Sequence, residues 1–404
     1  MSLRSLMFGW EYPPLHLGGL GVACQGLVQG LIKNGVQITL VLPHPVPTES
    51  EDLAILSPTE KHVERIRVQS MLSPYEGSEG YAMRTVRMSK ELQQIYGADL
   101  PEAVAHFTAM SVDMTQDTNP DIVHCHDWMT YGAGMAAARY HDKPLVTHIH
   151  ATELDRTHFH PNEWIYRMER KGFQAADRII AVSNYTKNLL TEHYGIPAQK
   201  ISVVHNAIQP ITAQDREPPI QAISSAPKPP MVLFLGRLTI QKGPIQFLEM
   251  AAAVHRFRPD VTFVIAGEGN MMAEVINRAC AMGLQDCILF TGKVANREAD
   301  KLYSQAACFV MPSLSEPFGL VALEAMAHGT PVIISKQSGA SEVVRHGFAI
   351  DFWDTEKMAD CVLTILREQP LAQQLRSEAP RSLQHLTWMK QASQVRSIYQ
   401  SLLS

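Results

Sequence analysis

The sequence predicts an α/β protein built from two doubly wound parallel sheets, and three observations support this fold class. Short apolar runs rich in β-branched residues alternate with segments of helical periodicity along most of the 404 residues. The runs are apolar nearly throughout, which is typical of strands that helices cover on both faces. A stretch with six prolines, residues 209–230, interrupts the pattern and predicts a linker between two halves.

The first half opens as a βαβ unit. We expect a strand at 3–8, a glycine-containing loop, a helix at about 20–34 and a strand at 36–42. Residues 44–105 mix polar turns with one expected helix near 89–100. The pattern then becomes regular again, with the helix NYTKNLLTEHYG (184–195) and strands in DIVHCHDW (121–128), KPLVTHIHATE (143–153), DRIIAVS (177–183) and KISVVHNAI (200–208).

The second half repeats the pattern. It opens on MVLFLGRL, continues with the expected strands TFVIAG, CILFTG, CFVMPS and PVIIS, and ends in an amphipathic helix. Because ligands of such sheets bind at the carboxyl ends of the strands, we expect a site there, in a cleft between two domains. The expected organisation is a first domain at 1–208, the linker 209–230, a second domain at 231–385 and a final helix at 386–404.

Composition narrows the possible partners. Hydrophobic residues make up 46% and charged residues 19%, as in globular proteins with a core. A formal net charge of -5 gives no general attraction to nucleic acid, and no apolar run reaches the roughly 18 residues of a membrane span. The six cysteines are scattered without a CxxC motif, which favours free thiols in a reducing cytoplasm.

Two glutamates eight residues apart are the strongest candidates for ligand binding. Glu316 precedes Pro317, which suits the first turn of a helix, and Glu324 follows about a turn inside that helix. Each carboxylate can accept hydrogen bonds from neighbouring hydroxyls of a sugar or ribose, and the amides at a helix start suit a diphosphate. We therefore expect both glutamates to face one ligand. The alternative is a solvated surface helix.

The segment from Glu316 to Glu324 resembles the E-x7-E motif of the retaining glycosyltransferases of family 4 (group 1), which include bacterial glycogen synthases. Other segments resemble the same family in order along nearly the whole chain, and only 44–105 and the linker match poorly. These segments are WEYPPLHLGGLG (10–21), HCHDW (124–128), HIHATELDR (148–156), AADRIIAVSNYTK (175–187), VVHNAI (203–208), GRLTIQKG (236–243) and SKQSGASEVV (335–344).

The resemblance implies the GT-B fold, two facing Rossmann-like domains whose last helix crosses back to the first domain. It also implies transfer of a hexosyl group from a nucleotide-sugar donor to a carbohydrate acceptor, with retention of configuration and no metal or other cofactor. The segments 335–344 and 351–354 look most like the glycogen-synthase branch, so UDP-glucose or ADP-glucose is the expected donor. The base, the acceptor and the oligomeric state stay open.

Arg237 and Lys242 are candidate phosphate ligands. Arg237 directly follows the expected strand MVLFLG, so it should project from the strand's carboxyl end. A leaving diphosphate gains negative charge in the transition state, and fixed cations stabilise that charge. The resemblance assigns both residues to the donor pyrophosphate, Glu316 to the sugar and Glu324 to the ribose. It also places Phe318, Gly319 and Leu320 in the donor site.

A glycine loop near the N-terminus, with Gly18, Gly19 and Gly21, permits close approach of a phosphate or sugar to the backbone. The loop also suggests a dinucleotide-binding dehydrogenase. That interpretation fails because Cys24 stands where the third glycine of G-x-G-x-x-G belongs, and no acid follows the next strand. By resemblance the loop belongs to the donor site.

Six histidines occur in three H-x-H pairs and raise the question of a zinc site. No cysteine or carboxylate pattern completes a standard zinc motif, so we expect no metal there. The resemblance instead places His150 beside the transferred sugar and Asp127 near the acceptor; the alternative for His150 is a core histidine at a strand end. The histidines are His124, His126, His148, His150, His158 and His160.

The resemblance supplies no nucleophile and no general base. It implies a front-face reaction in which the departing phosphate oxygen helps to deprotonate the incoming hydroxyl. Domain closure is then expected to complete the site and exclude water. Three alternatives remain: a nucleotide-sugar epimerase of similar fold, a phosphorylase, for which no pyridoxal-binding lysine segment is visible, and an inactive nucleotide-sugar-binding regulatory protein.

Overall fold

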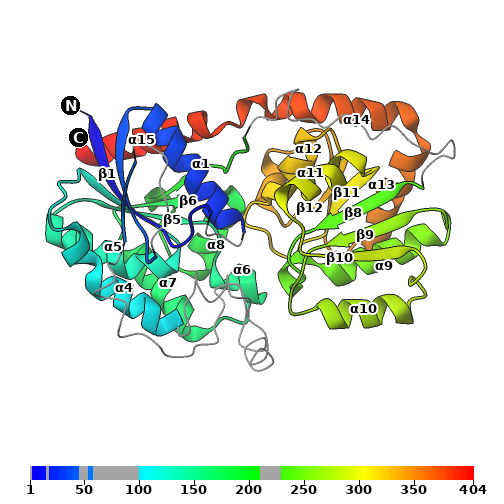
Figure 1. Ribbon diagram of the computed structural model, residues 1–404, viewed down its shortest axis with the longest axis horizontal. Helices are drawn as coiled ribbons and strands as arrows, with labels where there is room; N and C mark the ends of the chain where they lie inside the picture. The colour runs from blue at the N-terminus through cyan, green and yellow to red at the C-terminus, as the bar shows by residue number, and fades with distance from the viewer. Residues whose placement is uncertain (1, 15–17, 45–52, 58–99, 210–228) are drawn as a thin grey trace. The chain divides into compact units, whose positions relative to one another are not determined.

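The structure, a computed structural model, describes residues 2–14, 18–44, 53–57, 100–209 and 229–404. The chain divides into two compact units, of which unit 1 comprises Met1–Ala207 with Leu386–Ser404 and unit 2 comprises Ile208–His385. Each unit is a parallel sheet covered by helices on both faces (Figure 1). The linker expected at 209–230 and the helix expected near 89–100 lie almost wholly outside the described residues.

Unit 1 is built on a seven-stranded sheet of order β3-β2-β1-β4-β5-β6-β7, in which all pairs are parallel. The strands are β1 (Leu3–Phe8), β2 (Val36–Val41), β3 (Leu53–Leu56), β4 (Ile122–His126), β5 (Leu145–Ile149), β6 (Arg178–Ala181) and β7 (Ile201–Val203). The helices are α1 (Gly19–Lys33), α4 (Leu100–Thr115), α5 (Trp128–His141), α6 (Glu153–Thr157), α7 (Glu163–Ala175), α8 (Asn184–His193) and α15 (Trp388–Leu403), with a 3-10 turn at Ala198–Lys200.

Alternate residues of the central strands enter two different cores. On β4, Val123 and Cys125 pack into a cluster with residues of α4, α5 and α7. Ile122 packs on the opposite face, in a cluster with residues of α1 and α15. Because side chains alternate along a strand, His124 and His126 share the face of Ile122. Two histidines therefore enter the layer between the sheet and the pair α1–α15.

Helix α15 lies against α1, and the two are drawn side by side in red and blue (Figure 1). The contact depends on two glycines. A Cβ atom added at Gly26 would lie 2.3 Å from the ring of Trp388, and one added at Gly30 would lie 2.6 Å from the Trp388 carbonyl oxygen. The missing side chains therefore make the groove in α1 that receives the start of α15.

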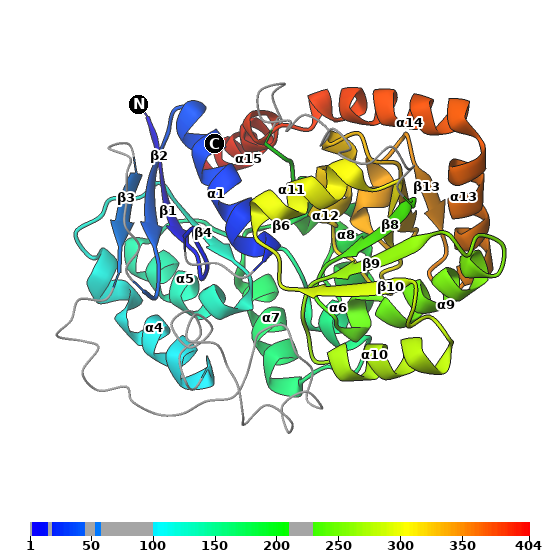
Figure 2. The ribbon, with the colours of Figure 1, turned by 45° about the vertical axis from the view of Figure 1, so that its right-hand side comes forward.

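Unit 2 is built on a six-stranded sheet of order β10-β9-β8-β11-β12-β13, again parallel throughout. Helices α9 and α10 lie on one side of it and α11 and α12 on the other (Figures 1 and 2). The strands are β8 (Met231–Leu235), β9 (Thr262–Ala266), β10 (Ile288–Gly292), β11 (Cys308–Met311), β12 (Val332–Ser335) and β13 (Phe348–Ile350). The helices are α9 (Pro244–His255), α10 (Met272–Ala281), α11 (Asn296–Gln305), α12 (Leu320–Ala327), α13 (Thr355–Arg367) and α14 (Gln369–Ser382), with 3-10 turns at Ile240–Lys242, Gly339–Glu342 and Leu383–His385.

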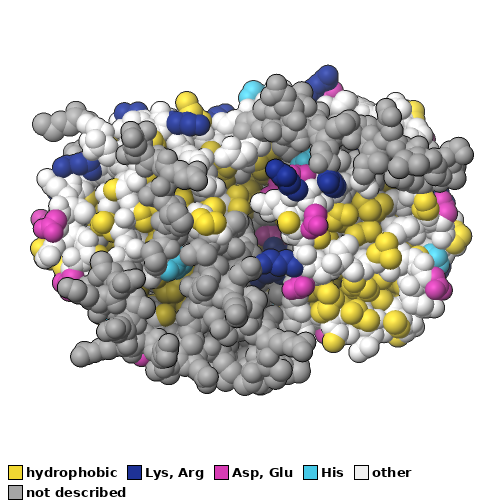
Figure 3. Space-filling model, viewed as in Figure 1, with side chains coloured by type: hydrophobic (Ala, Val, Ile, Leu, Met, Phe, Trp, Pro, Cys, Tyr) yellow, Lys and Arg dark blue, Asp and Glu magenta, His cyan; other side chains and the backbone are white. Residues whose placement is uncertain are grey.

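Both sheets reverse their strand order once, between β1 and β4 in unit 1 and between β8 and β11 in unit 2. Loops leaving the carboxyl ends of two such strands diverge to opposite faces and open a crevice, which is where doubly wound sheets bind ligands. The expected α/β class with two doubly wound sheets is confirmed. None of the described helices is long and apolar enough to cross a membrane. Charged side chains of both signs are interspersed on the face that Figure 3 shows.

Candidate functional site

In unit 2, several of the expected donor residues lie in the two loops that leave the β8/β11 switch point. The two strands pair directly, with Cys308 opposite Val232. The loop after β8 carries Arg237 and Lys242, and the loop after β11 carries Glu316. Residues 74 positions apart in the sequence are thereby brought to the same edge of the sheet.

Lys242 and Glu316 form an ion pair across this switch point. The Lys242 Nζ donates to Glu316 Oε2, and only 18% and 7% of the two side chains are exposed. The Ser313 hydroxyl lies 3.5 Å from the same carboxylate oxygen. The backbone of Glu316 is held as well, because its N–H donates to Gln337 and its carbonyl oxygen accepts from the Gly339 N–H, both at 2.9 Å. The carboxylate is therefore fixed in position.

The turn that presents Lys242 requires a glycine. Gly243 has φ 67°, and a Cβ atom there would lie 2.0 Å from the carbonyl oxygen of Pro312. The loop after β8 can approach the end of β11 this closely only without a side chain at this position. Pro244 then occupies the first turn of α9, where its missing N–H costs no hydrogen bond.

Arg237 directly follows Gly236 at the end of β8, and its side chain is half-buried. The strand's hydrogen bonds continue to this point, because the Gly236 N–H donates to the Ala266 carbonyl oxygen at 3.0 Å. Arg237 therefore leaves the sheet at the carboxyl edge, in the same loop as Lys242. This position of Arg237 was expected from the sequence, because Arg237 directly follows the apolar run of the strand.

The helix that carries Glu324 begins about one turn before that residue, as the sequence suggests. Pro317 lies in the loop, Gly319 with φ 99° is the N-cap residue, and α12 starts at Leu320. Phe318 is buried, and its carbonyl oxygen accepts from the Ala340 N–H. Pro317 thus precedes the helix and does not lie in its first turn, whereas Glu324 lies about a turn inside the helix, as expected. No side chain caps the start of α12 among the described residues.

Glu324 lies inside α12 and contacts a residue that the sequence analysis did not single out. The hydroxyl of Tyr303, from α11, donates to Glu324 Oε2 at 3.0 Å. Burial raises the pKa of Glu324 above its ordinary value, and the hydrogen bond from Tyr303 partly opposes that shift. Nothing in the spacing of Tyr303 predicts this contact, because it depends on how α11 and α12 pack.

In unit 1, Asp127 and His150 meet at the carboxyl ends of β4 and β5. Asp127 is 2% exposed, and its Oδ1 accepts a hydrogen bond from the backbone N–H of His150 at 2.7 Å. Burial raises the pKa of Asp127 to about 6, against the opposing charge of Arg156 and the backbone hydrogen bonds. Asp127 has φ 60° and ψ 166°, a strained conformation outside glycine. The structure thus buries a residue expected near an acceptor and uses its carboxylate to hold the loop of His150.

Gly18 has extended backbone and is the N-cap residue of α1, which begins at Gly19 and buries Gly21. Residues 15–17, just before this helix, lie outside the described part of the chain. The free amides of the first turn of α1 follow β1 at the carboxyl edge of the unit 1 sheet. Their geometry suits an anionic or hydroxylated ligand.

Four of the six histidines form a stack inside unit 1, on the face that α1 and α15 cover. His126 and His148 face each other in the β4–β5 register, and their ring centroids are 5.2 Å apart. His150 accepts or donates through Nε2 to His126 Nδ1 at 3.0 Å. His158 and His160 lie instead at the end of α6, where His158 is the left-handed C-cap residue.

Comparison with known proteins gives consistent matches over both halves of the chain. The model of the family described as "Glycosyltransferase Family 4" matches residues 17–210, and the model "Glycosyl transferases group 1" matches residues 215–382. An uncharacterized glycosyltransferase of Methanocaldococcus jannaschii is 30% identical over 353 residues, which cover 85% of this chain and 83% of that protein. A glycogen synthase of Mycobacterium tuberculosis is 29% identical over 98% of this chain and 94% of its own length.

The fold is also similar to solved structures. The catalytic domain of starch synthase IV from Arabidopsis thaliana, bound to ADP and acarbose, superposes with a TM-score of 0.71 at 16% sequence identity. The superposition covers 100% of both chains. At this identity the likeness concerns the two-sheet architecture.

Proposed function

The chain belongs to glycosyltransferase family 4, the group 1 glycosyltransferases, and we propose that it transfers a glucosyl group from UDP-glucose or ADP-glucose to a glucan or small sugar acceptor with retention of configuration. That it is a glycosyltransferase using a nucleotide-sugar follows from the family. The glucosyl donor is supported by the glycogen synthase relative and by the starch synthase structure bound to ADP. The observation that carries the proposal is the Lys242–Glu316 pair at the β8/β11 switch point.

The pair suits a donor because it holds a cation and a carboxylate ready at the same place. Without a ligand, Glu316 neutralises Lys242. A donor diphosphate offers Lys242 a second anion, which leaves the Glu316 oxygens able to accept hydrogen bonds from sugar hydroxyls. Arg237 in the same loop adds a second cation, and the uncapped start of α12 adds backbone amides at Leu320.

The charges of this site match the charge that develops during the reaction. As the bond from the anomeric carbon to the phosphate oxygen breaks, negative charge moves onto the nucleotide diphosphate. Arg237 and Lys242, which lie in the one loop after β8, stabilise that charge where it develops. The acceptor oxygen bonds to the anomeric carbon on the face that the leaving group vacates, and its proton passes to the departing phosphate oxygen. No protein base is needed for this proton balance.

Three further residues complete the proposed assignment. Glu324, held by Tyr303, accepts hydrogen bonds from the nucleotide ribose. His150 of unit 1 donates to the transferred sugar, and Asp127 positions it through its backbone. Because Asp127 is buried and already bonded to the His150 loop, we propose a positioning role for it.

The test is a donor screen on the full chain. UDP-glucose, ADP-glucose, UDP-galactose, UDP-N-acetylglucosamine and GDP-mannose are each offered with and without glycogen or maltooligosaccharides, and released nucleotide is measured. Glu316→Gln removes the charge but keeps the size, and Glu274→Gln on α10, an exposed glutamate, is the matched control. We expect one glucosyl donor to release nucleotide only with acceptor, in the wild type and the control but not in Glu316→Gln.

The other outcomes point to other functions. Conversion of a donor to its isomer without acceptor would indicate an epimerase. Nucleotide binding without turnover on any acceptor would indicate a regulatory protein. Turnover of a non-glucosyl donor would keep the transferase but contradict the glucosyl assignment.

A further inference from the structure

A group of buried histidines in unit 1 has a geometry that sugar transfer does not require. One ring nitrogen from each of His124, His126 and His148 can be chosen so that all three lie within 4.8 Å of one another. The rings are nearly parallel, with interplanar angles of 19° to 29°. The exposed fractions of the three residues are 0%, 0% and 3%. These imidazoles therefore form a compact cluster away from bulk water.

The cluster leaves ring nitrogens unsatisfied. Within the described part of the chain, His124 Nε2, His126 Nε2 and both ring nitrogens of His148 are buried and have no hydrogen-bond partner. A buried polar atom without a partner costs ~1–3 kcal/mol, so native proteins rarely leave several together. Apolar residues of the same strands, Ile122 and Val146, pack into the core on this face. Something that binds nitrogen lone pairs would remove this cost.

The opposite nitrogens of two of these rings are already held. His124 Nδ1 contacts the hydroxyl of Tyr399 from α15, and His126 Nδ1 contacts His150 Nε2 at 3.0 Å. A metal-binding histidine typically donates its second ring N–H to such an acceptor, which fixes the tautomer and orients the ring. With Nδ1 protonated in this way, Nε2 of His124 and of His126 carries the lone pair that a metal ion would bind, and both atoms are buried without a hydrogen-bond partner among the described residues.

From these observations we propose that His124, His126 and His148 bind a zinc ion, held between β4 and β5 beneath helix α15.

Zinc is the metal that this ligand set favours. Three neutral imidazoles form known zinc sites, in which a fourth position is left to water or another small ligand. The absence of thiolate and carboxylate among the three disfavours copper(I), calcium and magnesium. Nitrogens bound to one tetrahedral zinc at ~2.1 Å lie ~3.4 Å apart, so the three rings, which are now nearly parallel, must turn toward one another to bind the ion. The neutral form of imidazole is the one that binds metal.

The site would connect the core of unit 1 to the proposed sugar-binding histidine. A metal on His126 Nε2 keeps the proton on Nδ1, which then donates to His150 Nε2. His150 must in that case carry its own proton on Nδ1, so this nitrogen is the donor available to a sugar hydroxyl. Through Tyr399, the same ion would also tie α15 to the central strands.

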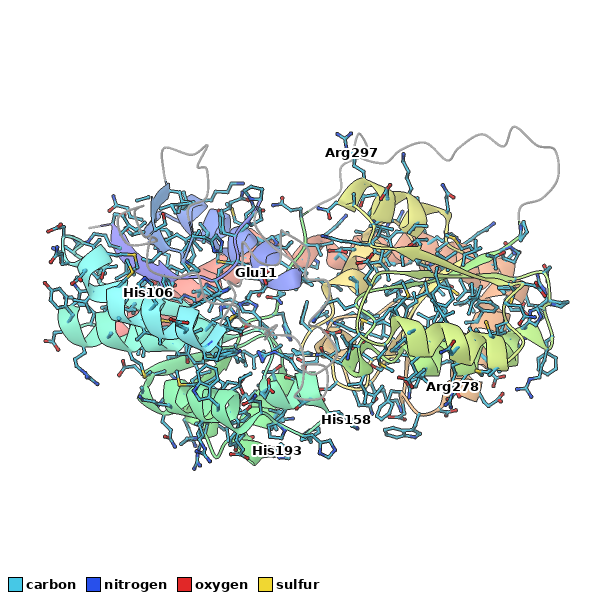
Figure 4. The ribbon with its side chains drawn as sticks, turned by 60° about the horizontal axis from the view of Figure 1, so that its bottom comes forward. Glu11, His106, His158, His193, Arg278 and Arg297 are labelled. Carbon is cyan, nitrogen blue, oxygen red and sulfur yellow. The ribbon has the colours of Figure 1, made fainter. Side chains whose placement is uncertain are left out.

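The proposal is tested on the full chain, first stripped with a chelator and then dialysed against Zn²⁺ or Co²⁺. Bound metal is measured by mass spectrometry, the melting temperature by differential scanning fluorimetry, and Co²⁺ coordination by visible ligand-field absorbance. His148→Phe and His124→Phe keep a flat ring in the stack but remove the nitrogens. His193→Phe is the matched control, because His193 is exposed at the end of α8 on the outside of unit 1 (Figure 4).

We expect about one zinc ion per wild-type or His193→Phe chain, and a Tm increase of roughly 5–10 °C at ~100-fold excess over Kd. His148→Phe and His124→Phe should bind no metal and show no Tm increase. Circular dichroism and the Tm in chelator show that these variants are folded. The proposal is overturned if the folded wild type retains no metal and its Tm does not increase when Zn²⁺ is added. It is also overturned if His148→Phe and His124→Phe retain as much metal as the control.

Discussion

The carboxylate of Asp127 accepts a hydrogen bond from the backbone N–H of His150 across 2.7 Å, although Asp127 itself is held in a conformation that normally only glycine adopts. The two features have opposite effects on stability. The charged hydrogen bond contributes about 1.5–3 kcal/mol, and the backbone strain costs about 1–3 kcal/mol. Replacing Asp127 by alanine or by glycine separates them.

Asp127→Ala loses the hydrogen bond and keeps the strain, whereas Asp127→Gly loses the hydrogen bond and relieves the strain. We expect the free energy of unfolding of Asp127→Gly to exceed that of Asp127→Ala by about 1 kcal/mol. This difference is the strain that glycine relieves, less roughly 0.5–1 kcal/mol for the greater freedom of glycine in the unfolded state. Urea unfolding measures the difference. An alanine variant as stable as the glycine variant would show that the backbone at Asp127 is not strained.

Arg237→Ala should lower kcat about 100-fold, because it removes one preorganised cation from the leaving diphosphate. Arg278→Ala is the matched control, since Arg278 is 53% exposed on α10 of the same unit (Figure 4). Steady-state rates with the donor identified by the screen give the comparison. Near-normal turnover by folded Arg237→Ala would remove Arg237 from the proposed mechanism.

Gly243→Ala should destabilise unit 2 by about 3 kcal/mol or more and weaken donor binding, because the new methyl group would collide with the backbone of Pro312. Gly195→Ala is a close control. Gly195 has the same φ of 67°, but a Cβ atom there meets nothing within 4 Å, so only the cost of the left-handed conformation, about 1–2 kcal/mol, remains. Equal losses of stability in the two variants would contradict the close approach at Gly243.

Tyr303→Phe should raise the KM for the donor roughly 2–10-fold with a smaller effect on kcat, because it removes one hydrogen bond from Glu324. It should also change the pH dependence. The hydrogen bond from Tyr303 lowers the pKa of Glu324, so its loss lets the carboxylate protonate at higher pH. As pH falls, the donor KM should therefore rise earlier in Tyr303→Phe than in the wild type. Coincident pH profiles would separate Glu324 from donor binding.

Glu169 makes the stability of unit 1 depend on pH. It is buried beside Arg156, Tyr194 donates to its Oε2, and burial raises its pKa to about 8. Unfolding returns the pKa to its ordinary value of 4.5, so between these values the unfolded state binds fewer protons. The contribution of Glu169 to the free energy of unfolding is fully present below pH 4.5, its pKa in the unfolded state. The contribution falls by up to about 1.4 kcal/mol per pH unit as the pH rises toward 8.

Glu169→Gln removes this titration and keeps an oxygen that can accept from the Glu153 N–H, which now bonds to Glu169 at 2.8 Å. We therefore expect the unfolding free energy of the wild type, relative to Glu169→Gln, to decrease between pH 5 and pH 8. Urea unfolding at several pH values tests it. A difference that is constant with pH would mean that Glu169 keeps an ordinary pKa.

Most strands of both sheets could be predicted because their apolar runs are stronger than any other local signal. β3 (Leu53–Leu56) was missed because it lies in the mixed segment 44–105, and β13 was missed because its three residues, Phe348–Ile350, lie in polar surroundings. α4 was missed because its start falls in the segment 44–105, where the pattern is mixed. The start of α12 was placed about one turn before Glu324, as observed, but Pro317 lies in the loop before the helix although it fits a first turn locally.

The candidate site could be predicted as a list of residues but not as a set of contacts. The spacing of Glu316 and Glu324 indicates a shared loop and helix, yet the Lys242–Glu316 pair depends on β8 lying beside β11. The H-x-H pairs likewise show that two histidines share a strand face. Only the register that sets His126 opposite His148 reveals that the pairs stack.

The return of the chain to unit 1 has a consequence for biosynthesis. A ribosome releases unit 2 in full before it releases Trp388, whose ring fills the groove at Gly26 in helix α1. The core of unit 1 therefore keeps that groove uncovered until α15 has been translated, while unit 2 can fold as soon as it emerges. A message that stops between unit 2 and α15 would yield a folded unit 2 attached to a unit 1 that lacks the helix closing its core.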